Sequence, residues 1–302
     1  MKAICIGHAT YDTTLPMEFY PKENNKYRIN REVQCGGGPA ATAAYLLAKW
    51  QVDTTFVGEI GTDFYAECIE EEFKQVGVNT TYLIHSNQIT TSNSYVIANT
   101  KTGSRTVINV RGENSNDLHI KENLTGNIIL ADGDHVETAL EIIKNNQQAI
   151  SILDAGTLKD ATITLGKVVD YLVCSKKFAE DFAKERIDFN KPNTLKEVYD
   201  KLEIYFKTKI IVTLEAVGCL VKLNNKYVII PSIKVEAVDS TGAGDIFHGA
   251  FAYFISHNYS LEQAIFLSNI TSALSVLKVG TRNSIPSIKE VLDIGRKRSV
   301  TK

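Results

Sequence analysis

The chain has 302 residues, of which 44% are hydrophobic and 23% charged, and its formal net charge is −2. These values are typical of a soluble globular protein with a substantial core, and they exclude a strongly basic nucleic-acid or membrane-surface binder. No apolar run approaches the roughly 18 residues that span a bilayer.

The cysteines and the N-terminus both indicate a cytoplasmic protein. Five cysteines are scattered without metal-ligand spacing, which is typical of buried thiols in a reducing compartment. They are Cys5, Cys35, Cys68, Cys174 and Cys219. Residues 1–7 resemble a buried strand rather than a signal peptide.

Short apolar runs alternate with helical segments along the chain. Strands are expected at residues 3–7, 54–57, 128–131, 150–153, 171–173 and 210–214, and helices at 40–50, 64–76 and 246–255. This alternation predicts an α/β fold with a mainly parallel sheet and crossover helices.

Two regions interrupt the alternation. Residues 12–35 include an extended-looking polar segment, 26–31, and residues 91–110 contain two alternating strands around the turn at 101–103. We expect them to pair into a small sheet over the carboxyl ends of the parallel strands, where open α/β sheets bind ligands. The chain is then one domain, 1–302, with a lid formed by about 12–35 and 91–112.

Most of the candidate catalytic groups lie in the segment 238–245, Val-Asp-Ser-Thr-Gly-Ala-Gly-Asp. Its glycines lead into a helix whose first N–H groups and dipole favour an anion such as phosphate. The alternative to a phosphate site is an ordinary loop in which Asp245 only caps the helix. In the catalytic hypothesis, Asp245 takes a proton from an acceptor hydroxyl while the N–H groups of Gly242, Ala243 and Gly244 hold the phosphoryl group.

A second glycine-rich segment, Gly36-Gly37-Gly38, precedes the first helix without dinucleotide or Walker spacing. It allows either close packing or close approach of a small polar substrate. Asp12 would bind substrate hydroxyls, or else be a solvated loop acid. The histidines, including His8, His135 and His248, show no metal or triad spacing.

Two motifs, residues 36–44 with 57–63 downstream and residues 238–250, resemble the ribokinase-like sugar kinases, also called PfkB carbohydrate kinases. The resemblance spans essentially the whole chain. It implies a three-layer α/β core with helices on both faces and a β-sheet lid. It also implies ATP-dependent phosphorylation of a sugar hydroxyl with Mg²⁺.

By this resemblance, the matching residues take the family's roles. Asp245 looks like the base, and Gly242, Ala243 and Gly244 look like the anion hole. Asp12, Gly37 and Gly38 match sugar-contacting positions, Thr213 and Gly218 border the nucleotide, and Asn269 and Ser272 lie near the adenine. Asp239, Thr241, Ser275, Gly280 and Ser284 match the residues that hold a monovalent cation in potassium-activated members.

The chain departs from the family pattern in three places. Ala41 stands where many sugar kinases have asparagine, and Glu215 stands where glycine is common. The family's Asn-x-x-Glu motif reads Ser175-Lys176-Lys177-Phe178 here, so its metal-organising acid is gone. Glu180 or Asp181, one turn on, would have to compensate.

The string at 36–44 is similar to the branch that contains bacterial sulfofructose and fructose-type kinases, where Lys26 and Asn109 have counterparts. Residues 130–135 offer no arginine for an anionic tail. Asp132 and Asp134 would repel a sulfonate by ~1 kcal/mol or more each, which favours a neutral or amine-bearing sugar. Arg105 and Arg111 are read as exposed strand arginines, with contacts to an anionic substrate as the alternative.

The sequence therefore predicts an ATP-dependent kinase acting on the primary hydroxyl of a ketose or related polyol. Two alternatives remain: a nucleoside kinase, with Phe19 and Tyr20 as stacking candidates, and a sugar sensor without catalysis. Exposed lid edges invite pairing, so the expected partner is a second copy of the chain, and no nucleic acid or membrane is expected.

Overall fold

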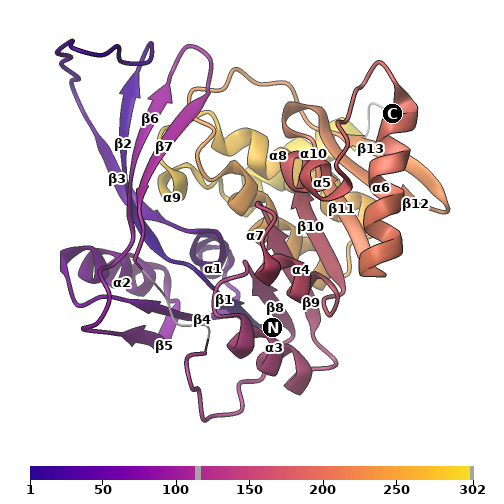
Figure 1. Cartoon of the computed structure of the whole chain (residues 1–302), viewed down its shortest axis with the longest axis horizontal. Helices are drawn as coiled ribbons and strands as arrows, with labels where there is room; N and C mark the ends of the chain where they lie inside the picture. Colours follow the sequence, from indigo (N-terminus) through magenta and orange to yellow (C-terminus); the bar gives the residue numbers. More distant parts are fainter. Residues whose placement is uncertain (113–116, 300–302) are drawn as a thin grey trace.

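A nine-stranded sheet forms the centre of the molecule (Figure 1), in the order β13-β12-β11-β10-β9-β8-β1-β4-β5. The computed structural model describes residues 1–112 and 117–299. The strands are β1 (Lys2–Ile6), β4 (Asp53–Ile60), β5 (Asn79–His85), β8 (Ile128–Ala131), β9 (Ile150–Ala155), β10 (Tyr171–Ser175), β11 (Lys209–Thr213), β12 (Gly218–Leu223) and β13 (Lys226–Pro231). Only the pairings of β12 with β11 and β13 are antiparallel.

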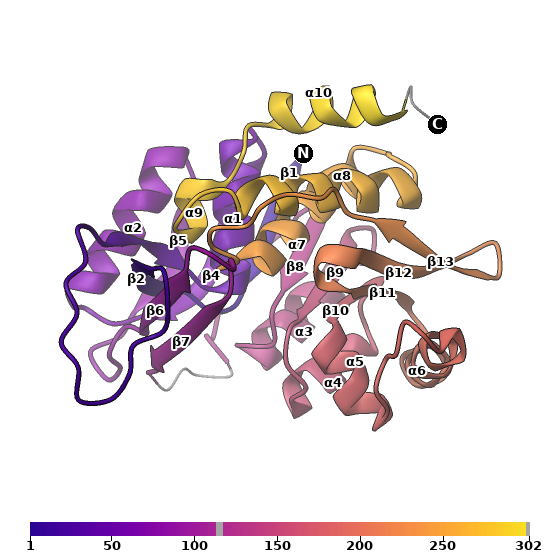
Figure 2. The same cartoon turned by 90° about the horizontal axis from the view of Figure 1, so that it is seen from above.

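Helices cover both faces of this sheet, as Figure 2 shows. They are α1 (Pro39–Lys49), α2 (Phe64–Val76), α3 (Val136–Asn145), α4 (Asp160–Gly166), α5 (Lys176–Ala183), α6 (Pro192–Phe206), α7 (Ala243–Ser256), α8 (Leu261–Ser275), α9 (Thr281–Ser284) and α10 (Ile288–Ser299). No helix in these described ranges is long and apolar enough to cross a membrane.

The core is split into two apolar clusters by the sheet. Along β1, Cys5 belongs to the cluster with α1, α7 and α8, whereas Ile4 and Ile6 belong to the cluster with α3 to α6. Successive side chains of a strand point to opposite faces, so a buried parallel strand is apolar throughout. This confirms the predicted three-layer α/β fold.

A separate four-stranded sheet stands beside the core (Figure 1), in the order β3-β2-β6-β7. Its strands are β2 (Thr10–Met17), β3 (Val33–Gly37), β6 (Asn93–Asn99) and β7 (Arg105–Val110). The expected pairing of two distant β segments is therefore confirmed. We call this sheet the lid.

One detail of the lid prediction was wrong. Residues 26–31 form no strand but lie in the loop between β2 and β3. The segment is mostly exposed and has no neighbouring strand to pair with. Its charged side chains gain more from water than from a pleated surface, so the strands use Thr10–Met17 and Val33–Gly37 instead.

Candidate active site

The start of α7 provides an open cradle of backbone N–H groups. Gly242 precedes the helix with φ of +71°, and a Cβ there would lie 2.1 Å from Cγ2 of Thr281, so only glycine fits. Among the described residues, no partner accepts the N–H groups of Gly244 or Asp245, and a Cβ on Gly244 would meet nothing within 4 Å. Free N–H groups beside open space at a helix N-terminus suit a phosphate.

Asp245 lies in the first turn of α7, beside this cradle. Burial raises the pKa of its carboxyl from 3.8 to about 7, and the negative charge of Asp154 adds to the rise. The positive charges of His248 and Arg105 oppose it, and Asp12 contributes in the same direction as Asp154. A base whose pKa is close to neutrality is well matched to proton abstraction at physiological pH.

The lid brings Asp12 and Asn109 into one row. Asp12 of β2 pairs with Ser94 of β6, and Ser94 pairs with Asn109 of β7. Residues directly opposite in neighbouring strands share a face, so a sugar laid across this row would meet a carboxylate, a hydroxyl and an amide. Asp12 is buried, which raises its pKa, while hydrogen bonds from Ser94 and Thr10 and the charge of Arg282 lower it.

The glycine-rich segment approaches the same row. A Cβ on Gly37 would lie 2.1 Å from Oδ2 of Asp12, so this backbone closes on the carboxylate. Gly38, with φ of +89°, turns the chain from β3 into α1. Lys26 belongs to the exposed loop between β2 and β3.

The residues expected at the nucleotide lie at the end of β11, at the start of β12 and along α8. Thr213 ends β11 and Gly218 begins β12. Asn269 is buried, and its amide nitrogen donates to the carbonyl of Ile230 at 3.0 Å. Ser272 donates to the carbonyl of Ala243 at 2.8 Å, which ties α8 to the anion cradle.

Glu215 adopts a backbone conformation that is more typical of glycine. Glu215 opens a 3₁₀ turn, Glu215–Val217, with φ of +55°. The left-handed region is strained for a residue with a Cβ, so glycine would fit this position with less strain.

The loops expected around a monovalent cation are held together by Asp239. One of its carboxylate oxygens accepts from the N–H and hydroxyl of Thr241, and the other accepts from the N–H of Gly280 at 2.9 Å. Two other residues of the expected cation site, Ser275 and Ser284, donate their hydroxyls to nearby carbonyls.

The proposed replacements for the missing metal-organising acid are occupied elsewhere. Glu180 accepts hydrogen bonds from Arg186 at 2.7 Å and from the N–H of Ile187 at 2.9 Å. Asp181 pairs with Lys177 at 2.7 Å. Glu180 is therefore engaged by a cation and a backbone N–H, whereas Asp181 has only a surface pair, so its compensating role stays a prediction.

Asp132 and Asp134 do not present two free carboxylates to a substrate, which corrects the sequence interpretation. Asp132 is enclosed and accepts from the N–H groups of His8, Ala40 and Asp134. Asp134 pairs with Arg111 at 2.5 Å and with His8 at 3.3 Å. The expected repulsion of an anionic substrate is therefore largely cancelled, and Arg111 is not a free strand arginine.

Two further residues make contacts that their sequence interpretation did not include. Arg105, at the start of β7, contacts Ser240 in the loop that leads to the cradle. His248 lies one turn after Asp245 in α7 and pairs with Asp154 at 3.0 Å. Neither pairing has a signal in sequence spacing, because the partners lie on different elements.

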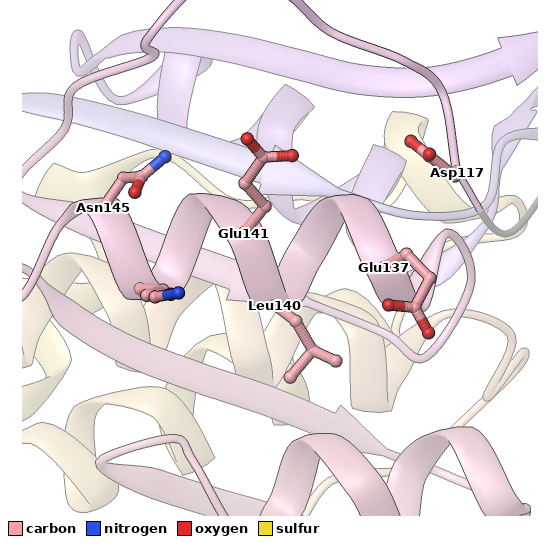
Figure 3. Close-up of a pocket in the computed structure, with 6 residues that line it drawn as sticks. Asp117, Glu137, Leu140, Glu141 and Asn145 are labelled. Atoms are coloured by element: carbon pink, nitrogen blue, oxygen red, sulfur yellow. The ribbon is translucent and has the colours of Figure 1, made fainter.

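A surface pocket away from the cradle does not suit a nucleotide (Figure 3). It is lined by Asp117 and by Glu137, Leu140, Glu141, Lys144 and Asn145 of α3. Three carboxylates in one shallow pocket repel a polyphosphate, so the nucleotide is better accommodated at the glycine-rich start of α7.

An anion cradle with an adjoining carboxylate, under a β lid at one end of an α/β sheet, defines the ribokinase-like class of kinases. The model of the pfkB family of carbohydrate kinases matches residues 1–288, and the chain belongs to that family. The protein is therefore a sugar or nucleoside kinase, a phosphotransferase that uses an alcohol group as acceptor.

Individual relatives agree with this assignment. The ribokinase of Staphylococcus aureus (strain COL) is 28% identical over 302 residues, covering 96% of this chain and 98% of its own. The ribokinase of Thermotoga maritima is 27% identical with a TM-score of 0.79, over 98% and 99% of the two chains. Arabidopsis thaliana ribokinase, solved with ribose and ATP, shares the fold at 22% identity, a TM-score of 0.75 and 98% coverage of both chains.

Proposed function

We propose that this protein transfers the γ-phosphoryl group of ATP to the primary hydroxyl of a ketose or related polyol. Asp245 takes the hydroxyl proton as the substrate oxygen bonds to the γ-phosphorus. The bond from that phosphorus to the β,γ-bridging oxygen breaks, and ADP leaves with the electron pair. The N–H groups of Gly242, Ala243 and Gly244 stabilise the charge that spreads over the phosphoryl oxygens.

The observation that carries this proposal is the pairing of Asp245 with the cradle. Its carboxyl has a pKa of about 7 and adjoins N–H groups that have no partner among the described residues. A carboxyl that merely capped the helix would accept a hydrogen bond from a first-turn N–H group and keep a low pKa. The pairing therefore favours a base over a cap.

The row of lid residues supports the proposed substrate class. Together, Asp12, Ser94 and Asn109 offer both hydrogen-bond donors and acceptors, which suit the hydroxyls of a polyol. Gly37 and Gly38 let the backbone approach the same ligand, and Lys26 would reach it from the loop above. Because Arg111 neutralises Asp134, sugar acids belong in the substrate screen beside neutral and amino sugars.

ATP would lie along Thr213, Gly218, Asn269 and Ser272. No group of three or more His, Cys, Asp or Glu side chains in the described residues is arranged to hold a metal. Mg²⁺ therefore fits here mainly as an ion held by the nucleotide phosphates, as is common for this ion. When bound, it supplies neutralisation of phosphate charge.

A monovalent cation is proposed beside the anion cradle. Asp239, Thr241, Ser275, Gly280 and Ser284 would surround it. The hydroxyl of Thr281 fits such a site, because it is buried and has no hydrogen-bond partner in the described part of the chain. A rise in kcat on adding KCl, but not choline chloride, is expected; equal rates would contradict this site.

A screen of acceptors tests the proposal. Purified protein is mixed with Mg²⁺ and ATP, and ADP release is measured with ketoses, polyols, sugar acids, amino sugars and nucleosides. We expect one or more ketoses or polyols to stimulate ADP release. A response to nucleosides alone would favour the nucleoside-kinase alternative, for which the exposed Phe19 and Tyr20 are the stacking candidates. Binding of sugar without ADP release would favour a sensor.

We also propose a homodimer through the lid, in the cytoplasm. Every residue of the edge strand β7 is exposed, including Val107, Ile108 and Val110. A second copy would cover this apolar edge. Light scattering should give a dimer mass that Ile108→Asp reduces to a monomer; a wild-type monomer at micromolar concentration would contradict the dimer. All five cysteines are free thiols, which suits a reducing compartment.

A further inference from the structure

The imidazole of His248 is surrounded by hydrogen-bond acceptors. Nδ1 lies 2.6 Å from the carbonyl oxygen of Gly244 and 3.0 Å from Oδ2 of Asp154, and Nε2 lies 3.1 Å from the carbonyl oxygen of Val173. A neutral imidazole has one donor and one acceptor nitrogen. Either neutral tautomer would therefore point a lone pair at an oxygen inside the protein.

Both nitrogens must then carry protons. His248 and Asp154 are each only 4% exposed, so water cannot relieve an unfavourable contact. The neighbouring carboxylate and the two carbonyls together raise the pKa of His248 to about 9, in spite of its burial. A charged imidazole is thus the form that satisfies every neighbour.

The ion pair between His248 and Asp154 connects β9, β10 and α7 next to the proposed reacting groups. Asp154 lies one residue before the end of β9, Val173 belongs to β10, and Gly244 contributes its N–H to the anion cradle on α7. His248 hydrogen-bonds the carbonyl oxygens of Gly244 and Val173 and forms an ion pair with Asp154, so it ties the first turn of α7 to β9 and β10.

Building on the proposed function, we infer that His248 is a positioning residue that works as a permanent cation. With Asp154 it forms a buried ion pair that fixes the anion cradle and keeps Asp245 ionisable near neutral pH. The charged groups that act on Asp245 are Asp154, His248, Arg105 and Asp12. Removing only the cation leaves Asp154 uncompensated, which disfavours ionisation of Asp245.

The test is the pH dependence of kcat/KM for a set of variants. In the wild type, kcat/KM should rise with pH through the pKa of Asp245. His248→Asn keeps a donor for Gly244 but removes the charge, and it should move this midpoint up by about one unit. Most of the lost rate should return at high pH, with the sugar KM unchanged. Adding Asp154→Asn should bring the midpoint back toward the wild-type value.

A matched control lies at the end of the same helix. His257 places Nδ1 2.7 Å from the carbonyl of Tyr253, also four residues back, but it is exposed and forms no ion pair within the part of the chain that the structure describes. His257→Asn should leave the profile unchanged. Coinciding midpoints for the wild type, His248→Asn and the double variant would overturn the inference.

A second readout does not depend on activity. In the wild type labelled at histidine carbons, the Cε1 resonance that disappears in His248→Asn should keep its imidazolium shift from about pH 6 to pH 8. Titration of that resonance between about pH 6 and pH 7 would overturn the inference even if no acceptor sugar is found. An imidazolium in a protein that phosphorylates no acceptor would instead overturn the proposed function alone.

Discussion

Arg105 donates two hydrogen bonds to Ser240, one to its carbonyl oxygen at 2.8 Å and one to its hydroxyl at 3.1 Å. The N–H of Ser240 in turn donates to the carbonyl of Gly103 at 3.0 Å. The turn between β6 and β7 is thereby attached to the loop that leads into the anion cradle. The lid and the phosphate site are therefore mechanically connected.

Arg105→Ala should lower kcat/KM about tenfold, which corresponds to ~1.4 kcal/mol of transition-state stabilisation. The variant loses the two contacts to Ser240 and the positive charge that favours ionisation of Asp245. Steady-state kinetics would measure the loss. Arg296→Ala, on the exposed end of α10, is the matched control, and equal losses in the two variants would contradict a specific role.

Gly242 and Gly244 should respond differently to alanine. Gly242→Ala should lower Tm and activity together, because the new methyl group meets Thr281 and the residue has a left-handed φ. Gly244→Ala should keep or raise Tm, since alanine favours a helix by up to about 1 kcal/mol over glycine. Its methyl group would still fill the open space proposed for phosphate, so activity should fall.

Thermal melts and ADP assays of the two glycine variants separate these effects. A Gly244→Ala protein with wild-type activity would argue against a phosphate at this position. A Gly242→Ala protein with unchanged Tm would argue against the close contact to Thr281.

Asp245→Asn should stabilise the fold at alkaline pH and much less at acid pH. The folded pKa of about 7 lies above the ordinary value of 3.8. Between these values the folded state holds the extra proton, so the stability linked to Asp245 is lost as pH rises through the folded pKa. Because asparagine does not titrate, the variant does not lose this stability as the pH rises. The difference in Tm between variant and wild type should be larger at about pH 8 than at about pH 5; a constant difference would contradict the raised pKa.

Arg282 should matter for stability as a partner of Glu72. The two residues are 210 positions apart, form a 2.9 Å ion pair, and meet where Glu72 also accepts from the N–H of Gly36. Arg282 is 1% exposed and lies over the rings of Tyr45 and Phe73. Arg282→Met should lower the free energy of unfolding by about 3–5 kcal/mol because it leaves a carboxylate without its partner.

Urea denaturation measures this loss, and Glu72→Met added to Arg282→Met should recover part of it. Exposed Lys289→Met, which breaks a surface pair with Asp293, should change stability by less than about 1 kcal/mol. A double variant less stable than Arg282→Met by the full effect of Glu72→Met would contradict the coupling.

The repeating features of this fold could be predicted from the sequence because they are local. Alternating apolar runs identify the buried parallel strands, and the turn at 101–103 identifies the lid hairpin, since both depend on neighbours in the chain. Residues 26–31 were misread because extended backbone becomes a strand only when a partner strand is available.

The contacts that complete the site are different in kind. Arg105 with Ser240, His248 with Asp154 and Arg282 with Glu72 join elements 94 to 210 residues apart. No periodicity relates such partners, because the tertiary fold alone brings them together. Asp245 could be identified because its glycine-rich segment carries both the anion cradle and the acid within one short stretch.

The most direct test of the central claim is the ADP-forming activity of Asp245→Asn with the acceptor sugar that stimulates the wild type. Asparagine keeps the shape of the side chain but cannot accept the proton, so kcat should fall about 10²–10⁴-fold with the protein still folded and still binding ATP. Turnover at the wild-type rate in this variant would contradict the assignment of Asp245 as the catalytic base.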